Sequence, residues 1–180
     1  MPNALAERLT AWGFSWEGLR DNRRGEWWLI AQMALIAAHL LPATPPPASL
    51  GLAWPLPVRL AGLALFGLGL VLAGQGALNL GASLSPLPEP MADAPLVTTG
   101  AYGRCRHPLY QALILCSLGV TVALGSVLHL GLMLGLVVVL GFKARREEAR
   151  LVLLHPDYGA YRQATAAILP GVPWLDWRSA

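Results

Sequence analysis

Two short segments of this 180-residue chain hold most of the side chains that could do chemistry. The first is residues 96–110, in which Arg106 can hold a carboxylate through two parallel hydrogen bonds. His107 precedes a proline, which suits the first turn of a helix, so we expect His107 at the N-cap beside backbone N–H groups that favour an anionic group. Tyr102 and Tyr110 add aromatic faces and hydroxyl groups. Such a segment fits either a ligand-binding loop or a capped helix start with interfacial tyrosines.

The second segment is residues 145–150, which contains the adjacent carboxylates Glu147 and Glu148 among three arginines. On a helix, neighbouring side chains point about 100° apart, so one carboxylate could face a pocket while the other faces water or an arginine. Tyr158 and Tyr161 follow and would share one face of a helix. A solvated charge run with an interfacial tyrosine pair is the alternative to a binding site.

The composition describes the scaffold that must position these segments. Hydrophobic residues make up 55% of the chain and charged residues 13%, with a mean hydropathy of +0.51. An ordinary soluble domain is about 25% charged. No Asp, Glu, Lys or Arg occurs in residues 27–58, 60–88 or 108–142, and a membrane span needs only about 20 apolar residues. These observations exclude a soluble globule, a disordered chain and a disulfide-stapled secreted module, and they predict a small integral membrane protein.

Other residues in or near the apolar stretches point to packing more than to chemistry. Cys105 and Cys116 fit neither a CxxC motif nor a zinc-ligand set, so we expect free thiols and no metal site. Gly131 and Gly135 form a GxxxG pattern that could seat two helices closely. His129 is expected to make a hydrogen bond between helices, with a functional group inside the membrane as the alternative.

The placement of charge predicts how the protein is oriented in the membrane. Of the thirteen Lys and Arg residues, four precede the first apolar stretch, two lie between the second and third, and six follow the last. Only Arg59 would lie on the other side of a four-span protein. This positive-inside bias predicts that both termini are cytoplasmic, and it explains the net charge of +3 without a nucleic-acid partner.

The apolar stretches predict one domain, residues 1–180, that is an all-α integral membrane protein with about four transmembrane helices. Gly125 and Ser126 divide the longest stretch into two tightly turned helices of about 17 residues each, and Pro156 is expected to end the charged continuation of the second. The expected elements are an amphipathic surface helix over residues 2–16 within a cytoplasmic segment of residues 1–26, spans over 27–41, 58–80 and twice within 108–142, and cytoplasmic helices over 143–154 and 157–168.

Six motifs follow one another in the order known from a family of membrane enzymes. They are Asn79-Leu-Gly81, residues 96–102, Arg106-His-Pro-Leu-Tyr110, Glu147-Glu148, Tyr158-Gly-Ala-Tyr161 and Ile168-Leu-Pro170. In this order and spacing, residues 71–174 resemble the isoprenylcysteine carboxyl methyltransferase family and, more distantly, the phospholipid N-methyltransferases. Residues 1–50 match none of these motifs, and the choice of acceptor could depend on them.

The resemblance implies that S-adenosyl-L-methionine is the methyl donor, bound in a cytoplasmic pocket that the helices after the hairpin cover. It also implies a lipophilic or lipidated acceptor that enters sideways from the bilayer. Glu147 or Glu148 would hold the cofactor's amino group or position the acceptor, and Arg106 would help to build the pocket, so these three are the candidate catalytic residues. The candidate cofactor-binding residues are Tyr102, His107, Leu109, Tyr110, Glu147, Tyr158 and Tyr161. Tyrosine faces and carboxylates stabilise cations such as the donor's sulfonium.

The function favoured by the resemblance is methylation of a lipophilic carboxylate by S-adenosyl-L-methionine. Methylation of a phospholipid or another amine is the alternative on the same fold. An amine must lose a proton during methylation, so a base beside the acceptor would favour the amine. A non-catalytic membrane subunit of the same fold and a membrane reductase are alternatives from other classes.

Overall fold

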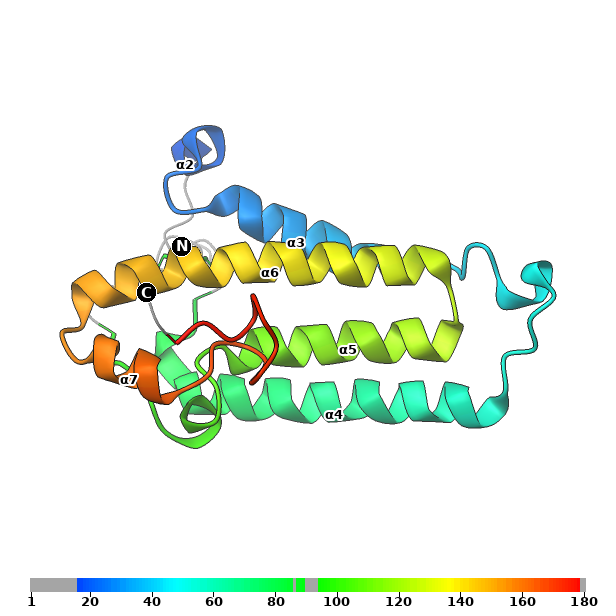
Figure 1. The fold of residues 1–180 in the computed structure, drawn as a ribbon. Coiled ribbons are helices and arrows are strands. Elements are labelled where there is room, and N and C mark those ends of the chain that lie inside the picture. Colours follow the sequence, from blue (N-terminus) through cyan, green and yellow to red (C-terminus); the bar gives the residue numbers. More distant parts are fainter. Residues whose placement is uncertain (1–15, 86, 90–93, 179–180) are drawn as a thin grey trace, which may run out of the picture.

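The computed structural model describes residues 16–85, 87–89 and 94–178 (Figure 1). Its α-helices are α2 (Trp16–Asp21), α3 (Glu26–Ala38), α4 (Leu56–Leu80), α5 (Pro108–Leu124), α6 (Val127–Leu154) and α7 (Tyr158–Ala164). No strand occurs in the described ranges, although Cys105 and Ala166 form an isolated parallel bridge. The all-α fold class is thus confirmed for this part of the chain. Residues 2–15, which hold most of the expected amphipathic helix, lie outside the described residues.

The long helices form a bundle in which α4 packs on α5, α5 packs on α6, and α3 packs on α6 (Figure 1). Among the described helices, α4 with 25 residues and α6 with 28 are long and apolar enough to cross a membrane. Leu60, Leu63 and Leu70 of α4 are exposed, which suits a helix that faces lipid. The apolar helices α3 and α5 are shorter, with 13 and 17 residues. Four complete spans therefore stay a prediction.

Helix α3 ends at Ala38, three residues before the expected end of the first span at Leu41. The N–H groups of His39, Leu40 and Leu41 bond to carbonyls three residues back, which makes a tightened final turn. Leu41 precedes a proline, and the residue before a proline disfavours the helical conformation. At about 1.5 Å per residue, α3 covers about 20 Å of a hydrocarbon core that is about 30 Å thick.

The turn between α5 and α6 lies where the sequence predicts it. Gly125 ends α5 with a φ of +59°, and Ser126 precedes the first residue of α6. A side chain at Gly125 would place its Cβ 2.5 Å from the ring of Trp54, so this position requires glycine for space as well as for conformation. The Trp54 indole N–H donates to the carbonyl of Val122 at 2.9 Å and fixes this end of the bundle.

At the other end of the bundle, α6 continues without a break to Leu154 and stops before Pro156, as predicted. Helix α7 is shorter than the expected helix over residues 157–168, because it ends at Ala164. The residues after it are extended and pair with the loop before α5. The carbonyls of Ala166 and Ala167 accept the backbone N–H groups of Arg106 and His107 at 2.8 and 2.9 Å. This pairing ties the end of α7 to the start of α5.

The close helix contact lies between α4 and α5 and not at the GxxxG pattern of α6. A Cβ at Gly131 would meet nothing within 4 Å, and one at Gly135 would meet only the side chain of Leu35. The buried residues of α4 are instead glycines spaced by seven: Gly62, Gly69 and Gly76. A Cβ at Gly62 would lie 2.4 Å from the backbone nitrogen of Ala123 in α5. Among the described residues, the GxxxG pattern of Gly131 and Gly135 therefore does not form the closest helix contact.

We expect Gly62→Ala to lower the free energy of unfolding by about 1–3 kcal/mol, because the added methyl group forces two backbones apart. Gly67→Ala is the matched control on the same helix, since a Cβ there meets nothing within 4 Å. In the control, the better helix propensity of alanine should leave stability unchanged or raise it by up to about 1 kcal/mol. Thermal unfolding in detergent measures the stability of both variants. Equal unfolding midpoints would contradict the close contact between α4 and α5 at Gly62.

Polar side chains inside the bundle join α3 to the hairpin at the end away from α7. His39 contacts the carbonyl of Leu35 through Nδ1 at 2.7 Å and the hydroxyl of Ser117 through Nε2 at 2.6 Å. Nε2 of His129 in α6 lies 3.4 Å from the carbonyl oxygen of His39. His129 thus bonds between segments, as the sequence predicts, and its partner is the residue that follows α3.

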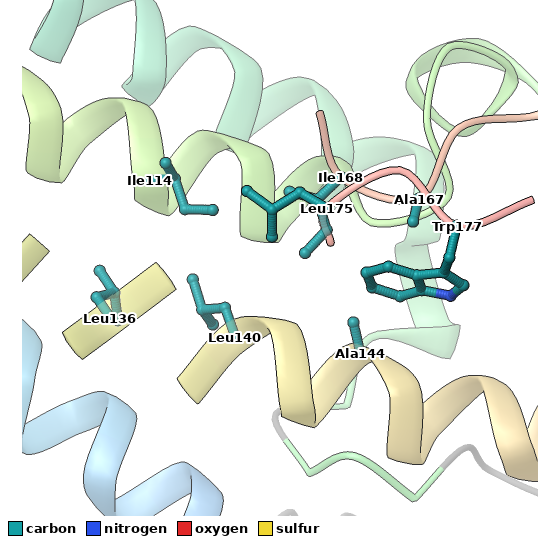
Figure 2. Packing of buried hydrophobic residues seen from close by; sticks show 8 residues of the cluster. All are labelled: Ile114, Leu136, Leu140, Ala144, Ala167, Ile168, Leu175 and Trp177. Atoms are coloured by element: carbon teal, nitrogen blue, oxygen red, sulfur yellow. The ribbon is translucent and has the colours of Figure 1, made fainter. Parts of the chain in front are cut away.

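The C-terminal segment, residues 165–178, folds back between α5 and α6 and completes the buried core. Figure 2 shows Ile168, Leu175 and Trp177 from this segment beside Leu140 and Ala144 of α6. The segment is held in a loop because the N–H groups of Ile168 and Leu169 both donate to the carbonyl of Leu175, at 3.0 and 3.2 Å. This fold brings Trp177 beside the two polar segments that the sequence singles out.

Candidate functional site

A buried ion pair joins the two polar segments. Arg106, from the loop before α5, donates through Nε to Oε1 of Glu148 at 2.8 Å and through Nη2 to Oε2 at 3.1 Å. The side chains are 0% and 3% exposed. Arg106 also donates to the carbonyls of Arg162, Thr165 and Trp177. The two-point grip on a carboxylate that the sequence predicts for Arg106 is therefore used on Glu148 of the same chain.

Glu148 accepts hydrogen bonds from more than one side. Besides Arg106, it accepts from Nε2 of His107 at 2.9 Å and from the indole N–H of Trp177 at 2.7 Å. Both of its oxygens are occupied, and it does not line the pocket described below. Glu148 therefore acts as the anchor on which the loop before α5, helix α6 and the C-terminal segment meet.

Glu147, the neighbouring carboxylate, faces the other way. Its side chain is 27% exposed, and its Oε2 accepts the hydroxyl of Tyr110 at 2.8 Å. The same oxygen lies 3.9 Å from Nδ1 of His107. Glu147 thus lines the pocket and Glu148 faces the arginine, which is one of the arrangements that the sequence allows.

A pocket opens beside Glu147, where α4 ends, α5 begins and the last turns of α6 meet α7. It encloses about 810 Å³ including its open mouth. Every candidate cofactor-binding residue from the sequence lines it, and so does Arg106: Tyr102, His107, Leu109, Tyr110, Glu147, Tyr158 and Tyr161. The sequence assigned no role to the remaining lining residues, which are Leu80, Ser83, Ser85, Leu87, Ala94, Pro95, Leu96, Val97, Leu151 and His155. Most of these residues lie in the connection that follows α4. This connection holds no motif until residues 96–102, where it reaches the loop before α5.

The tyrosines supply neutral hydroxyl groups and aromatic faces to the pocket. Burial is the largest cause that raises the pKa of Tyr102, Tyr158 and Tyr161 well above the usual range, so all three stay protonated. The Tyr161 hydroxyl donates to the carbonyl of Tyr102 at 2.5 Å. The Tyr158 hydroxyl is buried and has no hydrogen-bond partner among the described residues. A buried donor without a partner is costly, and Tyr158 lies in the wall of the pocket.

The loop before α5 owes its shape to a side chain of α4. Oδ1 of Asn79 accepts the backbone N–H of Ala101 at 2.8 Å. Gly100 has a φ of +62°, and a Cβ there would lie 2.5 Å from the same Asn79 oxygen. The asparagine and the glycine of the two motifs are thus one structural unit that presents Tyr102 to the pocket.

Cys105 lies next to the site but does not supply a nucleophile. Its thiol is buried and lies 3.6 Å from Oε1 of Gln111. Burial raises the pKa of Cys105 to about 11, so the thiol is protonated at neutral pH. Within the described ranges, no three His, Cys, Asp or Glu side chains are placed to hold a metal ion. The functional side chains that line the pocket include a carboxylate, an imidazole and tyrosine hydroxyl groups.

Comparison with protein families shows which family the chain resembles. The family model described as phospholipid methyltransferase matches residues 58–155, which is more than half of the chain. The matched range holds α4, α5, α6 and both polar segments, and it stops before α7 and the C-terminal segment. A comparison with curated proteins gave no match.

Proposed function

Because the chain belongs to the phospholipid methyltransferase family, whose members are membrane methyltransferases, we propose that its pocket binds S-adenosyl-L-methionine and methylates a lipophilic acceptor. The observation that carries the proposal is the meeting of seven side chains from three separate parts of the sequence in one pocket. The two apolar helices α4 and α6 support a location in the membrane.

The residues of the pocket fit this cofactor. S-adenosyl-L-methionine supplies a methyl group on a positively charged sulfur, and it also carries an amino group. Glu147 and the faces of Tyr102 and Tyr161 favour positive charge, while the unpartnered hydroxyl of Tyr158 can donate to the cofactor. Methyl transfer depends on alignment of donor and acceptor, so the packed shell around Arg106 would serve to hold these groups in place.

Charge supports a cytoplasmic position for the pocket. Arg104, Arg145, Arg146 and Arg150 all belong to the pocket end of α5 and α6. The positive-inside rule favours the cytoplasmic side for this end and the opposite side for the turn at Gly125. The protein would then be multi-pass with cytoplasmic termini.

The surroundings of the pocket support entry of the acceptor from the bilayer. Leu151 of α6 lines the pocket, and the next three residues, Val152, Leu153 and Leu154, expose apolar side chains. An acceptor with acyl or prenyl chains could stay in lipid while its head group reaches Glu147. Membrane lipids are then both the surroundings and the source of the substrate.

The charge of the pocket favours an amine as the acceptor over a carboxylate. A carboxylate acceptor would approach the carboxylate of Glu147, and the like charges repel. The guanidinium of Arg106 cannot compensate, because Glu148 and three carbonyls occupy it. We therefore place methylation of an amine head group first and the O-methylation favoured by the isoprenylcysteine resemblance second.

Binding of the cofactor is the first test. We expect S-adenosyl-L-methionine and S-adenosylhomocysteine to bind the purified protein with micromolar affinity, about 8 kcal/mol. Calorimetry in detergent measures the affinity, and labelled S-adenosyl-L-methionine with vesicles of ethanolamine phospholipid or of a prenylated cysteine identifies the product. Absence of binding would favour a non-catalytic subunit, and oxidation of a nicotinamide cofactor would favour a reductase.

Acceptor length tests entry from the bilayer. Each buried methylene contributes about 0.8 kcal/mol, so long acyl chains concentrate the acceptor in the membrane. We expect ethanolamine phospholipids to be methylated and glycerophosphoethanolamine, which has no acyl chains, to be a poor substrate at equal bulk concentration. Comparable rates for the two would contradict a lipid substrate.

A further inference from the structure

His107 is held in one orientation by the groups around it. Its Nε2 lies 2.9 Å from Oε1 of Glu148, and its ring stacks on Tyr110 with centroids 5.2 Å apart and planes 1° apart. Glu148 is itself fixed by Arg106 and by the indole N–H of Trp177. A carboxylate can only accept here, so Nε2 must carry the proton that it shares with Glu148.

The other ring nitrogen of His107 is then free to accept a proton. With Nε2 protonated, neutral imidazole has a lone pair on Nδ1. This atom makes no hydrogen bond with any residue of the described ranges, and it faces Glu147, which lines the pocket, at 3.9 Å. An imidazole with one nitrogen held by a carboxylate and the other free beside a pocket has the orientation that a general base requires.

We propose that Nδ1 of His107 is the general base that removes the proton from an amine acceptor; the inference rests on the proposed function. The acceptor ammonium gives one proton to Nδ1, and its nitrogen keeps the electron pair. That pair forms the bond to the methyl carbon, while the electrons of the carbon–sulfur bond return to sulfur and leave a neutral thioether. The imidazolium later releases its proton to water through the open mouth of the pocket.

The neighbouring Glu147 is the weaker candidate for the base. Its Oε2 already accepts the hydroxyl of Tyr110. The charged and titratable groups that face His107, directly or through Glu148, are Glu147 and Glu148 of α6, Arg106 before α5, Tyr110 of α5 and Arg162 of α7. An imidazolium at His107 would lie beside both carboxylates, which stabilises the proton transfer.

The variant His107→Gln tests the role in turnover, since its amide can still donate to Glu148 but cannot act as a base. With vesicles of ethanolamine phospholipid, we expect kcat at neutral pH to fall by about 10²–10⁴. Because His107 also lines the pocket, the dissociation constant of S-adenosylhomocysteine should rise as well, but by a much smaller factor than that by which kcat falls. The deficit in kcat should shrink as pH rises, because more of the acceptor amine arrives without its proton. A variant with normal kcat and a normal pH profile, or one that loses turnover and S-adenosylhomocysteine binding together, would overturn the proposal.

A second measurement reads the proton directly and does not depend on turnover. The chain has four histidines, so ¹⁵N-histidine NMR in detergent, with the spectrum of His107→Gln for assignment, isolates the signals of His107. We expect a proton on Nε2 and a lone pair on Nδ1 at neutral pH; a proton on Nδ1 of the neutral ring would overturn the proposal. If the variant does not fold, the wild-type enzyme decides, since a kcat that stays flat between about pH 5 and pH 8 also overturns it.

The outcomes separate this inference from the proposed function. Binding of S-adenosyl-L-methionine without methylation of any amine by the wild-type protein overturns the role of His107 and leaves the cofactor assignment in place. Absence of cofactor binding overturns both. Amine methylation that is insensitive to His107→Gln overturns the general base alone.

Discussion

Replacement of Arg106 by methionine is expected to lower the free energy of unfolding by about 3–5 kcal/mol, the usual cost of breaking a buried ion pair. Methionine fills much of the space but leaves the carboxylate of Glu148 buried without its main partner. Three backbone carbonyls, those of Arg162, Thr165 and Trp177, lose their donor in the same variant. Thermal or denaturant unfolding in detergent measures the loss, and binding of S-adenosylhomocysteine should disappear with it.

Arg104→Met is the matched control, because Arg104 is exposed and donates to the side chain of Gln75. Exposed polar contacts contribute little, so this variant should stay within about 1 kcal/mol of the wild type. A double variant sharpens the test. Adding Glu148→Met to Arg106→Met removes the uncompensated charge and should restore part of the stability. If the losses of stability of Arg106→Met and Glu148→Met simply add up in the double variant, the two side chains do not act as a pair. That result would contradict this account of the buried ion pair.

Replacement of Glu147 by glutamine is expected to weaken binding of S-adenosyl-L-methionine about ten- to a hundredfold, with little change in stability. The expected loss corresponds to about 1.5–3 kcal/mol, the usual contribution of a hydrogen bond to a charged group. Stability should hold because the Glu147 side chain is 27% exposed and glutamine can still accept the hydroxyl of Tyr110. Calorimetry with the purified variant gives the affinity, and thermal unfolding gives the stability.

Glu148→Gln is the matched control and should show the opposite pattern. Its amide nitrogen would face a guanidinium or an indole N–H, so we expect a loss of stability first and of binding only as a consequence. If both variants bind normally, the two glutamates are a solvated charge run with no part in the site.

The comparison of two ligands reveals what Glu147 holds. S-adenosylhomocysteine has the amino group of S-adenosyl-L-methionine but lacks the charged sulfur. An equal loss of affinity for both ligands in Glu147→Gln would place the carboxylate on the amino group. A larger loss for S-adenosyl-L-methionine would place it near the sulfonium. Unchanged affinities with a raised KM for the acceptor would mean that Glu147 positions the acceptor.

The parts of the fold that local sequence predicts are α4, the hairpin turn and the end of α6. Each depends on signals that lie within the element: a long charge-free stretch, a glycine with positive φ at Gly125, and a proline after His155. The packing of α4 on α5 was not predictable in the same way. Which glycines face a neighbour depends on how each helix is rotated, and the rotation is set by the partner, so Gly62 and Gly69 could not be distinguished from Gly67 and Gly74 by their spacing to nearby residues.

The candidate site shows the same limit. The motifs around His107 and Glu147 indicated side chains that do meet in one pocket, because the resemblance carries information about distant contacts. The sequence left open which of Glu147 and Glu148 faces the pocket, since that choice follows from the grip of Arg106 on α6. Nothing in the local sequence separates Trp177 from a tryptophan at a membrane interface, yet its indole N–H and its carbonyl both complete the buried ion pair.

The distances along the chain within this ion pair impose an order on biosynthesis. Arg106 is joined to Glu148 across 42 positions and to Trp177 across 71. At a synthesis rate of about 5–20 residues per second, the ribosome needs about 4–14 seconds between Arg106 and Trp177. A charged side chain does not enter hydrocarbon alone, so in the proposed topology Arg106 stays in water or among lipid head groups while α5 and α6 insert. The pocket would then close only after the hairpin is in the bilayer, and a nascent chain that stalls before Trp177 would lack the last partner of the ion pair.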